Sequence, residues 1–591
     1  MQPNAQGVCA NDAFNVIGGA YEVPEICGEN SGQHLYVNFN GDDDIKLVIN
    51  TNSDSTFGRS WRFKVTQIGC DCPTRAPNGC LQHYTGISGV VQSLNYGTTI
   101  AGQGTRQLAN TNYGICVAPA AGYCGIQWSQ GTASPNTFTI SGDATMAPTS
   151  LSGDDCTTDF IVVANPYIAG TPANTDRFCG TQLPTLVSYS RPFVLYVVTD
   201  GNEANDVANS GFLLSYTQLA CRNSICRSQK IELFGKTPNN RTAKFLPFWN
   251  FGIGVVRFAN NVCDSADGLY GTCYTKRQCA EVNGGIISGS CASGIGVCCV
   301  VLLGCGSISS SNNTYFVNEG YPAAYSGAGC CTYTIQRCSP DICQVRIDFL
   351  SLTLAQPDGT GRCIYDALTI TGGTSNIPII CGENSGQHVY VNFNDDQDIR
   401  IVIDTSADVD LARSWNIKVT QLACDCGTLA PPGCLMYYTD ISGTVNSFNY
   451  GTTANGALVG DVLGTRELAN LNYGICIDPK PGYCCITWSQ SGGDPYSFTL
   501  TGDTMALGNT LPTGSVVGTD CTTDFVVIPN PQEVAADRFC GNAFPTLTSC
   551  AKPFVLTVVT NADEMGDVAN RGFSLTYTQK RCACAGNCYP V

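Results

Sequence analysis

A long internal repeat constrains this chain more than any other feature. Residues 27–72 return almost letter for letter at 381–426, so that CGENSGQHLYVNF is answered by CGENSGQHVYVNF. The offset is 354 residues from Cys9/Cys363 to Cys80/Cys434, and it settles near 361 by Arg177/Arg538. A register kept over several hundred residues means that whole domains, each with its own core, were duplicated.

The two copies do not begin alike. The second copy has about sixty strand-rich residues, from Cys305 to Arg362, before Cys363, whereas only eight residues precede Cys9. We therefore expect the chain to open inside a domain, with residues 1–72 short of strands. The true start and a secretory signal are expected upstream of Met1.

Composition favours an extracellular protein. The chain has 591 residues, enough for four or five domains, and 36 cysteines that mostly keep their register between the copies. Such a framework is typical of an oxidising compartment. Zinc binding by cysteine pairs is the alternative, but no cysteine and histidine set has zinc-finger spacing and there are only three histidines.

Charge and hydropathy exclude other classes of partner. A net charge of −17 without a basic cluster disfavours nucleic acid, anionic membranes and polyanions such as heparin. No stretch approaches the roughly 20 apolar residues of a membrane span. Sequons at Asn240 and Asn312 lie in segments expected to be exposed loops, and they are candidate glycosylation sites.

Strict alternation of apolar residues predicts short strands. Leu35, Val37 and Phe39 share one face, and the same holds at 45–49 and 61–65 and at the matching positions of the second copy. With 64 glycines, 28 prolines and no convincing helical stripe, the pattern predicts an all-β chain of tandem antiparallel sandwiches.

Four cysteine pairs bracket a short strand that has an aspartate soon after the first cysteine: Cys9/Cys27, Cys156/Cys179, Cys363/Cys381 and Cys521/Cys540. The pattern C-x-x-D-x-L/F-x-V/I, then CG, then a closing G-F-x-L-x-Y at 211–216 and 572–577, resembles the CUB domain, an extracellular jelly-roll sandwich. Segments beginning at Gly79, Cys305 and Gly433 are similar to the opening of that domain. The resemblance implies a disulfide in each of the four pairs. We also expect hairpin bridges Cys338–Cys343 and Cys116–Cys124.

The resemblance covers about 85% of the chain and sets its domain organisation. CUB-like modules are expected at 1–72 (incomplete), 73–221, 301–426 and 427–582. A linker at 222–262, a cysteine-rich segment at 263–300 and a tail at 583–591 complete the layout.

The six cysteines of 263–300 end in a Cys-Cys pair and resemble a clip domain of arthropod secreted proteins. That resemblance implies the bridges Cys263–Cys298, Cys273–Cys291 and Cys279–Cys299, although six cysteines allow 15 connectivities by spacing alone. A segment this short needs such bridges for order, since its core is too small. The whole layout, with its QHxYVxF and GxCxIxW phrases, is similar to CUB proteins of insects and crustaceans.

Catalysis is not expected, although clip and CUB modules often flank trypsin-like proteases. The chain has no GDSGG segment, and His83 is replaced by Tyr437 in the second copy. His34 and His388 lie opposite the apolar face of their strands and read as partly exposed structural residues. We identify no catalytic residue.

Calcium is the main chemical hypothesis. Many CUB domains bind this ion with a glutamate and two aspartates, because hard oxygen ligands suit it. The inner aspartate is present as Asp159, Asp366 and Asp524, and Asp200 supplies the second one beside Asp159. The fourth module has Asn561 there, so a site is expected only in 73–221. The alternative is that these carboxylates cap turns.

A binding role follows from these observations. Tyr36, Tyr390, Tyr96 and Tyr450 near polar turns are candidates for an exposed patch that contacts glycans or proteins. The predicted function is a secreted, non-catalytic recognition or adhesion protein that binds proteins or glycans through tandem modules and gains avidity. The alternatives are a structural matrix or cuticle-associated component, and a fragment of a CUB and clip-containing serine protease without its catalytic domain.

Overall fold

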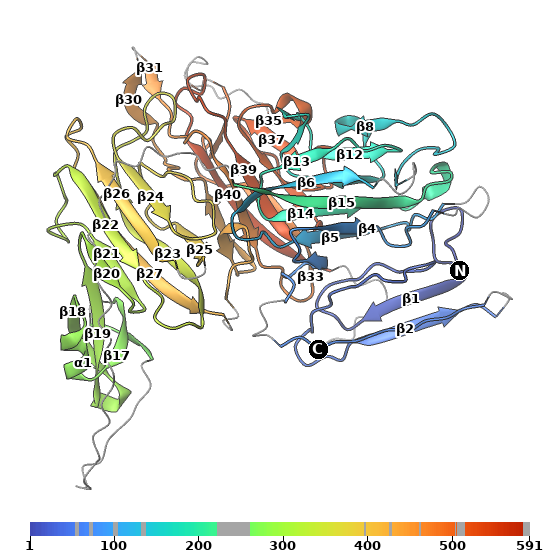
Figure 1. Cartoon of the computed structure of the whole chain (residues 1–591). Helices are drawn as coiled ribbons and strands as arrows, with labels where there is room; N and C mark the ends of the chain where they lie inside the picture. Colours follow the sequence, from blue (N-terminus) through green and yellow to red (C-terminus); the bar gives the residue numbers. More distant parts are fainter. Residues whose placement is uncertain are drawn as a thin grey trace, which may run out of the picture. The chain divides into compact units, whose positions relative to one another are not determined.

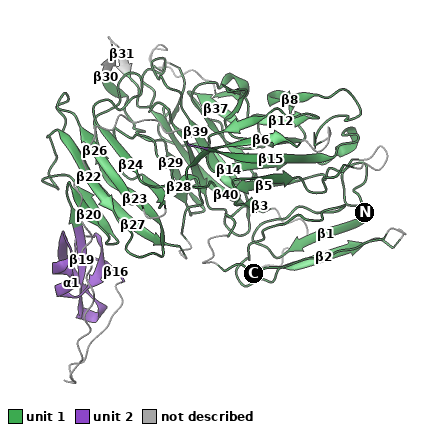
Figure 2. Ribbon diagram, viewed as in Figure 1, with its two compact units in different colours: residues 1–219, 302–591 green, residues 220–301 purple. Residues whose placement is uncertain are grey.

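The structure is a computed structural model in two compact units. It describes residues 1–53, 58–69, 75–98, 105–131, 137–221, 261–266, 268–394, 397–424, 428–459, 462–502, 504 and 515–582. The first unit comprises residues 1–219 and 302–591, and the second comprises residues 220–301 (Figure 2). Most of the expected linker, the sequon at Asn240 and the expected tail lie outside the described residues.

The second module (73–221) is a sandwich of two sheets, as predicted. One sheet has the order β3-β5-β14-β9-β12-β8 and the other β11-β10-β13-β6-β15-β4, with β7 on β15 (Figure 1). Trp128 lies between them fully buried. The elements are β3 (Cys80–Tyr84), β4 (Ser88–Gln92), β5 (Asn112–Val117), β6 (Tyr123–Gln130), β7 (Phe138–Thr139), β8 (Ser150–Ser152), η1 (Gly153–Asp155), β9 (Phe160–Val162), β10 (Pro166–Ile168), β11 (Thr171–Pro172), β12 (Arg177–Gly180), β13 (Leu186–Ser188), β14 (Phe193–Val198), η2 (Glu203–Asn205) and β15 (Gly211–Ala220).

The fourth module (427–582) repeats this sandwich. Its sheets have the orders β28-β32-β39-β36-β37-β35 and β29-β40-β33-β38, with β34 on β40. The elements are β28 (Cys434–Tyr438), β29 (Ser442–Asn446), β30 (Asn455–Val459), β31 (Val462–Gly464), β32 (Asn472–Ile477), β33 (Tyr483–Gln490), β34 (Phe498–Thr499), β35 (Ser515–Val517), η4 (Gly518–Asp520), β36 (Phe525–Val527), β37 (Arg538–Gly541), β38 (Leu547–Ser549), β39 (Phe554–Val559) and β40 (Gly572–Arg581).

The third module (301–426) has a different strand set. In one sheet β27 lies between β21 and β23, and β25 pairs with β23; the other sheet has the order β20-β22-β26-β24. Trp415, on β27, is fully buried. The strands are β20 (Ser307–Ser309), β21 (Thr314–Val317), β22 (Gly329–Ile335), β23 (Ile342–Thr353), β24 (Ala367–Thr371), β25 (His388–Asn392), β26 (Ile399–Thr405) and β27 (Ser414–Ala423).

Among its described residues, the N-terminal module (1–72) forms one strand pair, β1 (Asp12–Ile17) with β2 (Lys46–Thr51). Strands were predicted at 35–39 and 61–65 as well, and neither forms. The reason is that a strand needs a ladder partner, and the third-module strands that pair with the matching residues come from 305–353.

The second unit is a small disulfide-linked fold. Its helix α1 (Lys276–Glu281) begins with a capping box, in which Thr275 and Gln278 satisfy each other's backbone amides. The strands and the remaining short helix are β16 (Val262–Asp264), β17 (Tyr270–Tyr274), β18 (Gly285–Cys291), η3 (Ala292–Gly294) and β19 (Gly296–Leu303). Three bridges hold it: Cys263–Cys298, Cys273–Cys291 and Cys279–Cys299. These are the pairs that the clip resemblance implied.

The four bridges expected around the short strands are also formed: Cys9–Cys27, Cys156–Cys179, Cys363–Cys381 and Cys521–Cys540. Further bridges that were not anticipated include Cys80–Cys116, Cys305–Cys331, Cys343–Cys424, Cys434–Cys476, Cys484–Cys582 and Cys485–Cys550.

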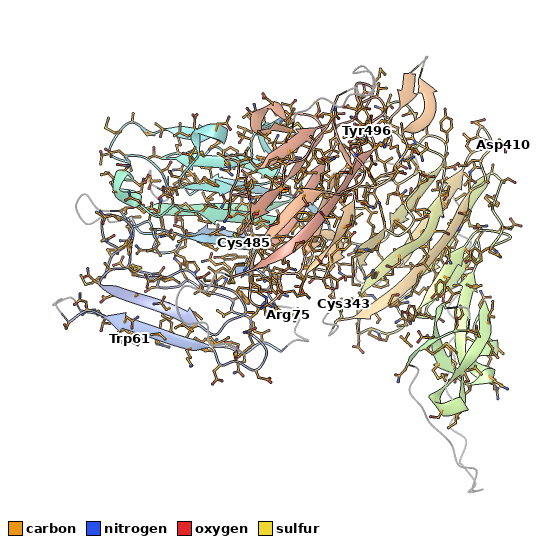
Figure 3. All side chains as sticks on the ribbon, turned by 180° about the vertical axis from the view of Figure 1, so that it is seen from behind. Trp61, Arg75, Cys343, Asp410, Cys485 and Tyr496 are labelled. Atoms are coloured by element: carbon orange, nitrogen blue, oxygen red, sulfur yellow. A yellow bond between two sulfur atoms is a disulfide. The ribbon has the colours of Figure 1, made fainter. Side chains whose placement is uncertain are left out.

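The two expected hairpin bridges are wrong. Cys116 bonds Cys80, because the parallel pairing of β3 and β5 brings their Cα atoms to 5.8 Å, and Cys124 is bonded elsewhere. Cys343, labelled in Figure 3, bonds Cys424 just beyond the neighbouring strand β27, which leaves Cys338 as a free, exposed thiol.

Within the first unit, the second and fourth modules contact each other reciprocally. Arg177 pairs with Asp537 at 2.6 Å, and its repeat equivalent Arg538 pairs with Asp176 at 2.8 Å. All four side chains are at most 4% exposed. Equivalent residues therefore exchange equivalent partners, as across a two-fold dimer interface.

Candidate metal centres

Asp159 stands at the entrance to β9, where the sequence Thr-Thr-Asp-Phe turns into the sheet. Its Oδ1 accepts a hydrogen bond of 2.8 Å from the backbone N of Asp200. Its Oδ2 has no hydrogen-bond partner among the described residues, and the side chain is 1% exposed. A buried carboxylate oxygen left in this state is costly unless a cation or a proton joins it.

The loop between β14 and β15 supplies two more carboxylates. Asp200 Oδ1 accepts from Asn202 N at 2.7 Å, and Asn202 caps η2, which starts at Glu203. This turn points Glu203 and Asp206 inward, at 1% and 6% exposure. One oxygen from each of Asp159, Glu203 and Asp206 lies within 4.8 Å of the other two.

The polar neighbours of this cluster hold it without neutralising it. Gln107 Nε2 donates to Glu203 Oε2 at 2.7 Å, and Gly142 N donates to Asp206 Oδ1 at 2.5 Å. Glu203 Oε1 and Gln107 Oε1 have no hydrogen-bond partner among the described residues. Three carboxylate side chains thus converge, and no ion pair with a described cationic side chain is formed by any of them.

Burial shifts the titration of all three acids upward. It raises the pKa of Glu203 to about 9 and that of Asp159 to about 8, with the neighbouring carboxylates adding to both. The pKa of Asp206 is raised for the same first reason. Without a cation the folded site therefore retains protons near neutral pH, and a divalent ion would take their place.

The fourth module repeats the cluster with Asp524, Glu564 and Asp567, again within 4.8 Å of one another. Burial raises their pKa values to about 7, 10 and 6. Glu467 replaces Gln107 at the equivalent position; it is 3% exposed, both of its oxygens are unpartnered, and burial beside Glu564 raises its pKa well above the ordinary value. This second site is therefore the more acidic of the two.

The first and third modules neutralise the same inner aspartate with arginine. Arg413 contacts both carboxylate oxygens of Asp366, at 2.7 and 2.9 Å, and both residues are fully buried. Arg59 Nε donates to both carboxylate oxygens of Asp12, at 2.9 and 2.8 Å, and these hydrogen bonds hold the pKa of Asp12 well below its usual range. The inner aspartate is thus paired with an arginine in the first and third modules, and it lies beside two other carboxylates in the second and fourth.

Each cluster lies at the junction of a module pair. Glu203 N donates to Gln6 O of the preceding module at 3.3 Å, and Glu564 N donates to Thr360 O at 3.3 Å. A Cβ placed on Gly7 would lie 2.2 Å from Cγ of Glu203, and one on Gly361 would lie 2.4 Å from Cγ of Glu564. The preceding module therefore closes over the cluster, and glycine is required for that approach.

Ion pairs reinforce both junctions. Arg106 reaches Glu29 at 2.8 Å, and the equivalent Arg466 pairs with Glu383 at 2.5 Å. The same geometry in both pairs indicates that the junction was duplicated together with the modules.

The predicted ligand pair is corrected in part. Asp159 and Asp200 reach the same loop end. The carboxylate of Asp200, however, caps its own turn, and it is the backbone N–H of Asp200 that donates to Asp159. Asn561 N contacts Asp524 in the same way at 2.8 Å, so the expected difference between the two modules disappears. Glu203, Asp206, Glu467, Glu564 and Asp567 were missed. The repeated spacing Glu-x-x-Asp-Val-Ala-Asn at 203–209 and 564–570 would have revealed four of them.

Other sequence-predicted residues are structural. His388 is 5% exposed with Nε2 3.0 Å from the carbonyl of Tyr437, and burial lowers its pKa to about 4, so the expectation of partial exposure is wrong. Tyr390 is buried, Tyr96 buries its hydroxyl and Tyr450 contacts Asp494, which removes the expected exposed tyrosine patch. Tyr36 is half-buried.

The sequon residue Asn312 uses its side chain in packing. Its Nδ2 donates to the carbonyl of Gln421 at 3.0 Å, and its Oδ1 accepts from Gln421 N at 2.7 Å. Glycosylation at Nδ2 would compete with this hydrogen bond. No helix in the described part of the chain is long and apolar enough to cross a membrane.

Family models match three of the modules. The model of the animal CUB domain matches residues 77–219 and 431–580, and that of the CUB domain matches residues 305–418. No curated protein matches.

Solved structures to which the chain is similar include the CUB1-EGF-CUB2 domains of rat MASP-1, at 12% identity over 47% of this chain and 99% of that chain, with a TM-score of 0.17. The CUB1-EGF-CUB2 domain of human MASP-1/3 has 13% identity over 57% and 100%, with a TM-score of 0.18. The full extracellular region of zebrafish Gpr126/Adgrg6 has 12% identity over 48% and 37%, with a TM-score of 0.18. These scores are too low to transfer geometry or ligands.

Proposed function

Because CUB models match more than half of its length, the chain belongs to the CUB-domain family, and we propose that it is an extracellular recognition protein whose two module pairs are each stiffened by calcium. CUB domains are extracellular protein-interaction modules without catalytic machinery, and the many disulfides suit that compartment. The proposed partners are extracellular proteins, with glycans as a second ligand class.

One observation carries the calcium part of the proposal. The same buried carboxylate cluster occurs in the second and fourth modules, while the first and third modules place an arginine against the corresponding aspartate. Carboxylate and amide oxygens are the ligands that Ca²⁺ prefers. Asp159, Glu203 and Asp206 would hold the ion in one site, with Gln107 donating a hydrogen bond to Glu203, and Asp524, Glu564 and Asp567 would hold it in the other, with Glu467 beside them.

Calcium would supply the positive charge that the clusters lack. The residues of this chain would position the ligands. The η2 turn orients Glu203, and the backbone amides of Asp200 and Asn561 hold the inner aspartates. Residues 6–7 and 360–361 cover the acids. An ion bound at a junction would restrict the angle between the paired modules. Preorganised modules on one chain bind a multivalent partner with less loss of entropy.

The proposal is tested by binding measured with and without calcium. The full chain, immobilised, is exposed to extracellular fluid and to a glycan array in 2 mM Ca²⁺ or in EDTA, alongside Glu203→Gln/Glu564→Gln and the exposed control Asp42→Asn. We expect ligands retained by the wild type and by Asp42→Asn in calcium, and lost in EDTA and in the double variant. Retention that is indifferent to calcium and to both cluster substitutions would contradict the proposal.

A further inference from the structure

The second module orients both halves of its ion pairing with the fourth module. The guanidinium of Arg177 lies 4.3 Å from the ring centre of Phe160 in the same module, and Asp176 accepts a hydrogen bond of 2.7 Å from the backbone N of Asn165. The fourth module holds its equivalent arginine and aspartate in the same two ways. Each module therefore presents one oriented cation and one oriented anion to its neighbour.

The backbones of the two modules also approach each other closely in both directions. A Cβ placed on Gly114 would lie 2.3 Å from the carbonyl oxygen of Lys552, and one on Gly474 would lie 2.3 Å from that of Arg191. Equivalent groups thus meet across a local two-fold axis, and a surface of this kind is complementary to a copy of itself. We call this surface of the second module the contact face. Its residues are Asn112, Gly114, Asp176, Arg177, Ser190 and Tyr196.

One hydrogen bond across the contact is formed in one direction only. Ser190 Oγ donates to Asn472 Oδ1 at 2.9 Å, whereas Ala551 stands at the position equivalent to Ser190. Asn112 is the equivalent of Asn472, and its buried Oδ1 has no hydrogen-bond partner among the described residues. A second copy of the contact face would bring a Ser190 hydroxyl to each Asn112 and satisfy this acceptor.

Tyr196 shows the same asymmetry. Its hydroxyl donates to the carbonyl of Pro553 at 3.0 Å, and the equivalent position in the fourth module holds the shorter Thr557. Between two contact faces, each Tyr196 would have the carbonyl of the opposite Pro192 to bond. The contact face therefore matches a copy of itself more completely than it matches the fourth module.

We propose that the contact face is an assembly surface, and that its ligand is the contact face of a second copy of this chain. In the closed chain the fourth module occupies this surface. When the two module pairs separate, Arg177 of each chain pairs with Asp176 of the other, and Ser190 of each bonds Asn112 of the other. The separation breaks no strand pairing, because the sheets of the second and fourth modules share no strand.

The closed chain and the assembly compete for the same surface. The fourth module has the advantage in dilute solution, because it belongs to the same chain and its effective concentration is high. A chain whose fourth module is blocked loses that competitor and exposes the contact face to its own copies.

The experiment therefore blocks the fourth module and leaves the second intact. Gly474→Val/Arg538→Asp places a side chain against the backbone of the second module and a like charge against Asp176, which prevents closure. A combined variant carries Gly114→Val/Arg177→Asp as well and so blocks both modules. Sedimentation equilibrium of the full chains gives their masses. All samples contain EDTA, so that the result is independent of calcium binding.

We expect the wild-type chain at its monomer mass of 62.6 kDa and the Gly474→Val/Arg538→Asp chain at the mass of a dimer. The combined variant should stay monomeric, as should Arg277→Asp, which reverses an exposed charge outside the contact. Adding Ser190→Ala to Gly474→Val/Arg538→Asp should raise the dissociation constant of the dimer by about tenfold or more, because each Asn112 again lacks a donor.

Amide exchange of β15 reports whether the second module is folded, since β15 lies in the sheet opposite β5 and β12. The blocking substitutions lie in the fourth module, so even the loss of its fold would leave the contact face free to pair. A monomeric Gly474→Val/Arg538→Asp chain with β15 protected as in the wild type would overturn the proposal. Equal dimerisation of the combined variant would do the same, as would a dimer that is indifferent to Ser190→Ala.

Discussion

Replacing Glu203 by glutamine should stabilise the metal-free second module at neutral pH, because the substitution removes a buried carboxyl group that titrates. Burial raises the pKa of Glu203 to about 9 from an ordinary 4.5. Between these values the folded state holds a proton that the unfolded state has released. The free energy of unfolding therefore falls as the pH rises through this window.

The size of the effect follows from the shift. Each pKa unit corresponds to about 1.36 kcal/mol, so at pH 7.5, about three units above 4.5, the glutamate costs the folded module about 4 kcal/mol. Glutamine carries no titrating proton and can keep the contact with Gln107. We therefore expect Glu203→Gln to be more stable than the wild type by up to about 4 kcal/mol at pH 7.5, and little different at pH 4.5.

Native-state hydrogen exchange in EDTA measures this for one module at a time, with peptides from β9 and β14 as the readout. Asp42→Asn, which removes an exposed charge and keeps Glu203, is the control and should show the same pH dependence as the wild type. Calcium at 100 times its Kd should add about 2.7 kcal/mol to the wild type and much less to Glu203→Gln. A Glu203→Gln module that is less stable at pH 7.5, or shifted equally at both pH values, would refute the reasoning.

Further predictions concern the ion pairs and the junctions. Arg413→Met should destabilise the third module by about 3–5 kcal/mol, because it leaves Asp366 as an unpaired buried charge. The double variant Asp366→Asn/Arg413→Met should recover most of that loss in urea unfolding. The equivalent Arg59→Met should cost less, because that pair is partly exposed. Arg177→Met should cost about 3–5 kcal/mol at the contact between the second and fourth modules, and a normal melting profile would contradict the reciprocal pairing. Gly7→Ala should lower both the melting temperature and calcium affinity, because its Cβ would meet Glu203; Gly32→Ala, which also has a positive φ but open space, should show only the backbone strain of about 1 kcal/mol.

Much of the fold could be predicted from the sequence, because alternation and disulfide spacing are local signals. The strand pattern around Trp415 and the bridge Cys363–Cys381 illustrate this, since both depend on residues close in the chain. The prediction of strands at 35–39 and 61–65 failed for a non-local reason. Alternation identifies which side chains are apolar and favour burial, but a strand forms only where a second strand supplies the hydrogen bonds of the ladder.

The same limit applied to the candidate site. The motif around Asp159 was visible, but Glu203, Asp206 and Gln107 reach it only through the folding of the β14–β15 loop and of the segment before β5. Asp200 looked like a ligand because it is an aspartate at the expected position, whereas the structure uses its backbone amide. A backbone contact is indifferent to side-chain identity, which is why Asn561 serves equally well.

Calcium stoichiometry tests the central claim most directly. Equilibrium dialysis or calorimetric titration of the full chain should find two specifically bound Ca²⁺ ions, one for each cluster. Glu203→Gln and Glu564→Gln should each retain one ion, and the double variant should retain neither, while Asp42→Asn keeps both. A chain that binds no calcium, or two ions that persist in Glu203→Gln/Glu564→Gln, would contradict the account.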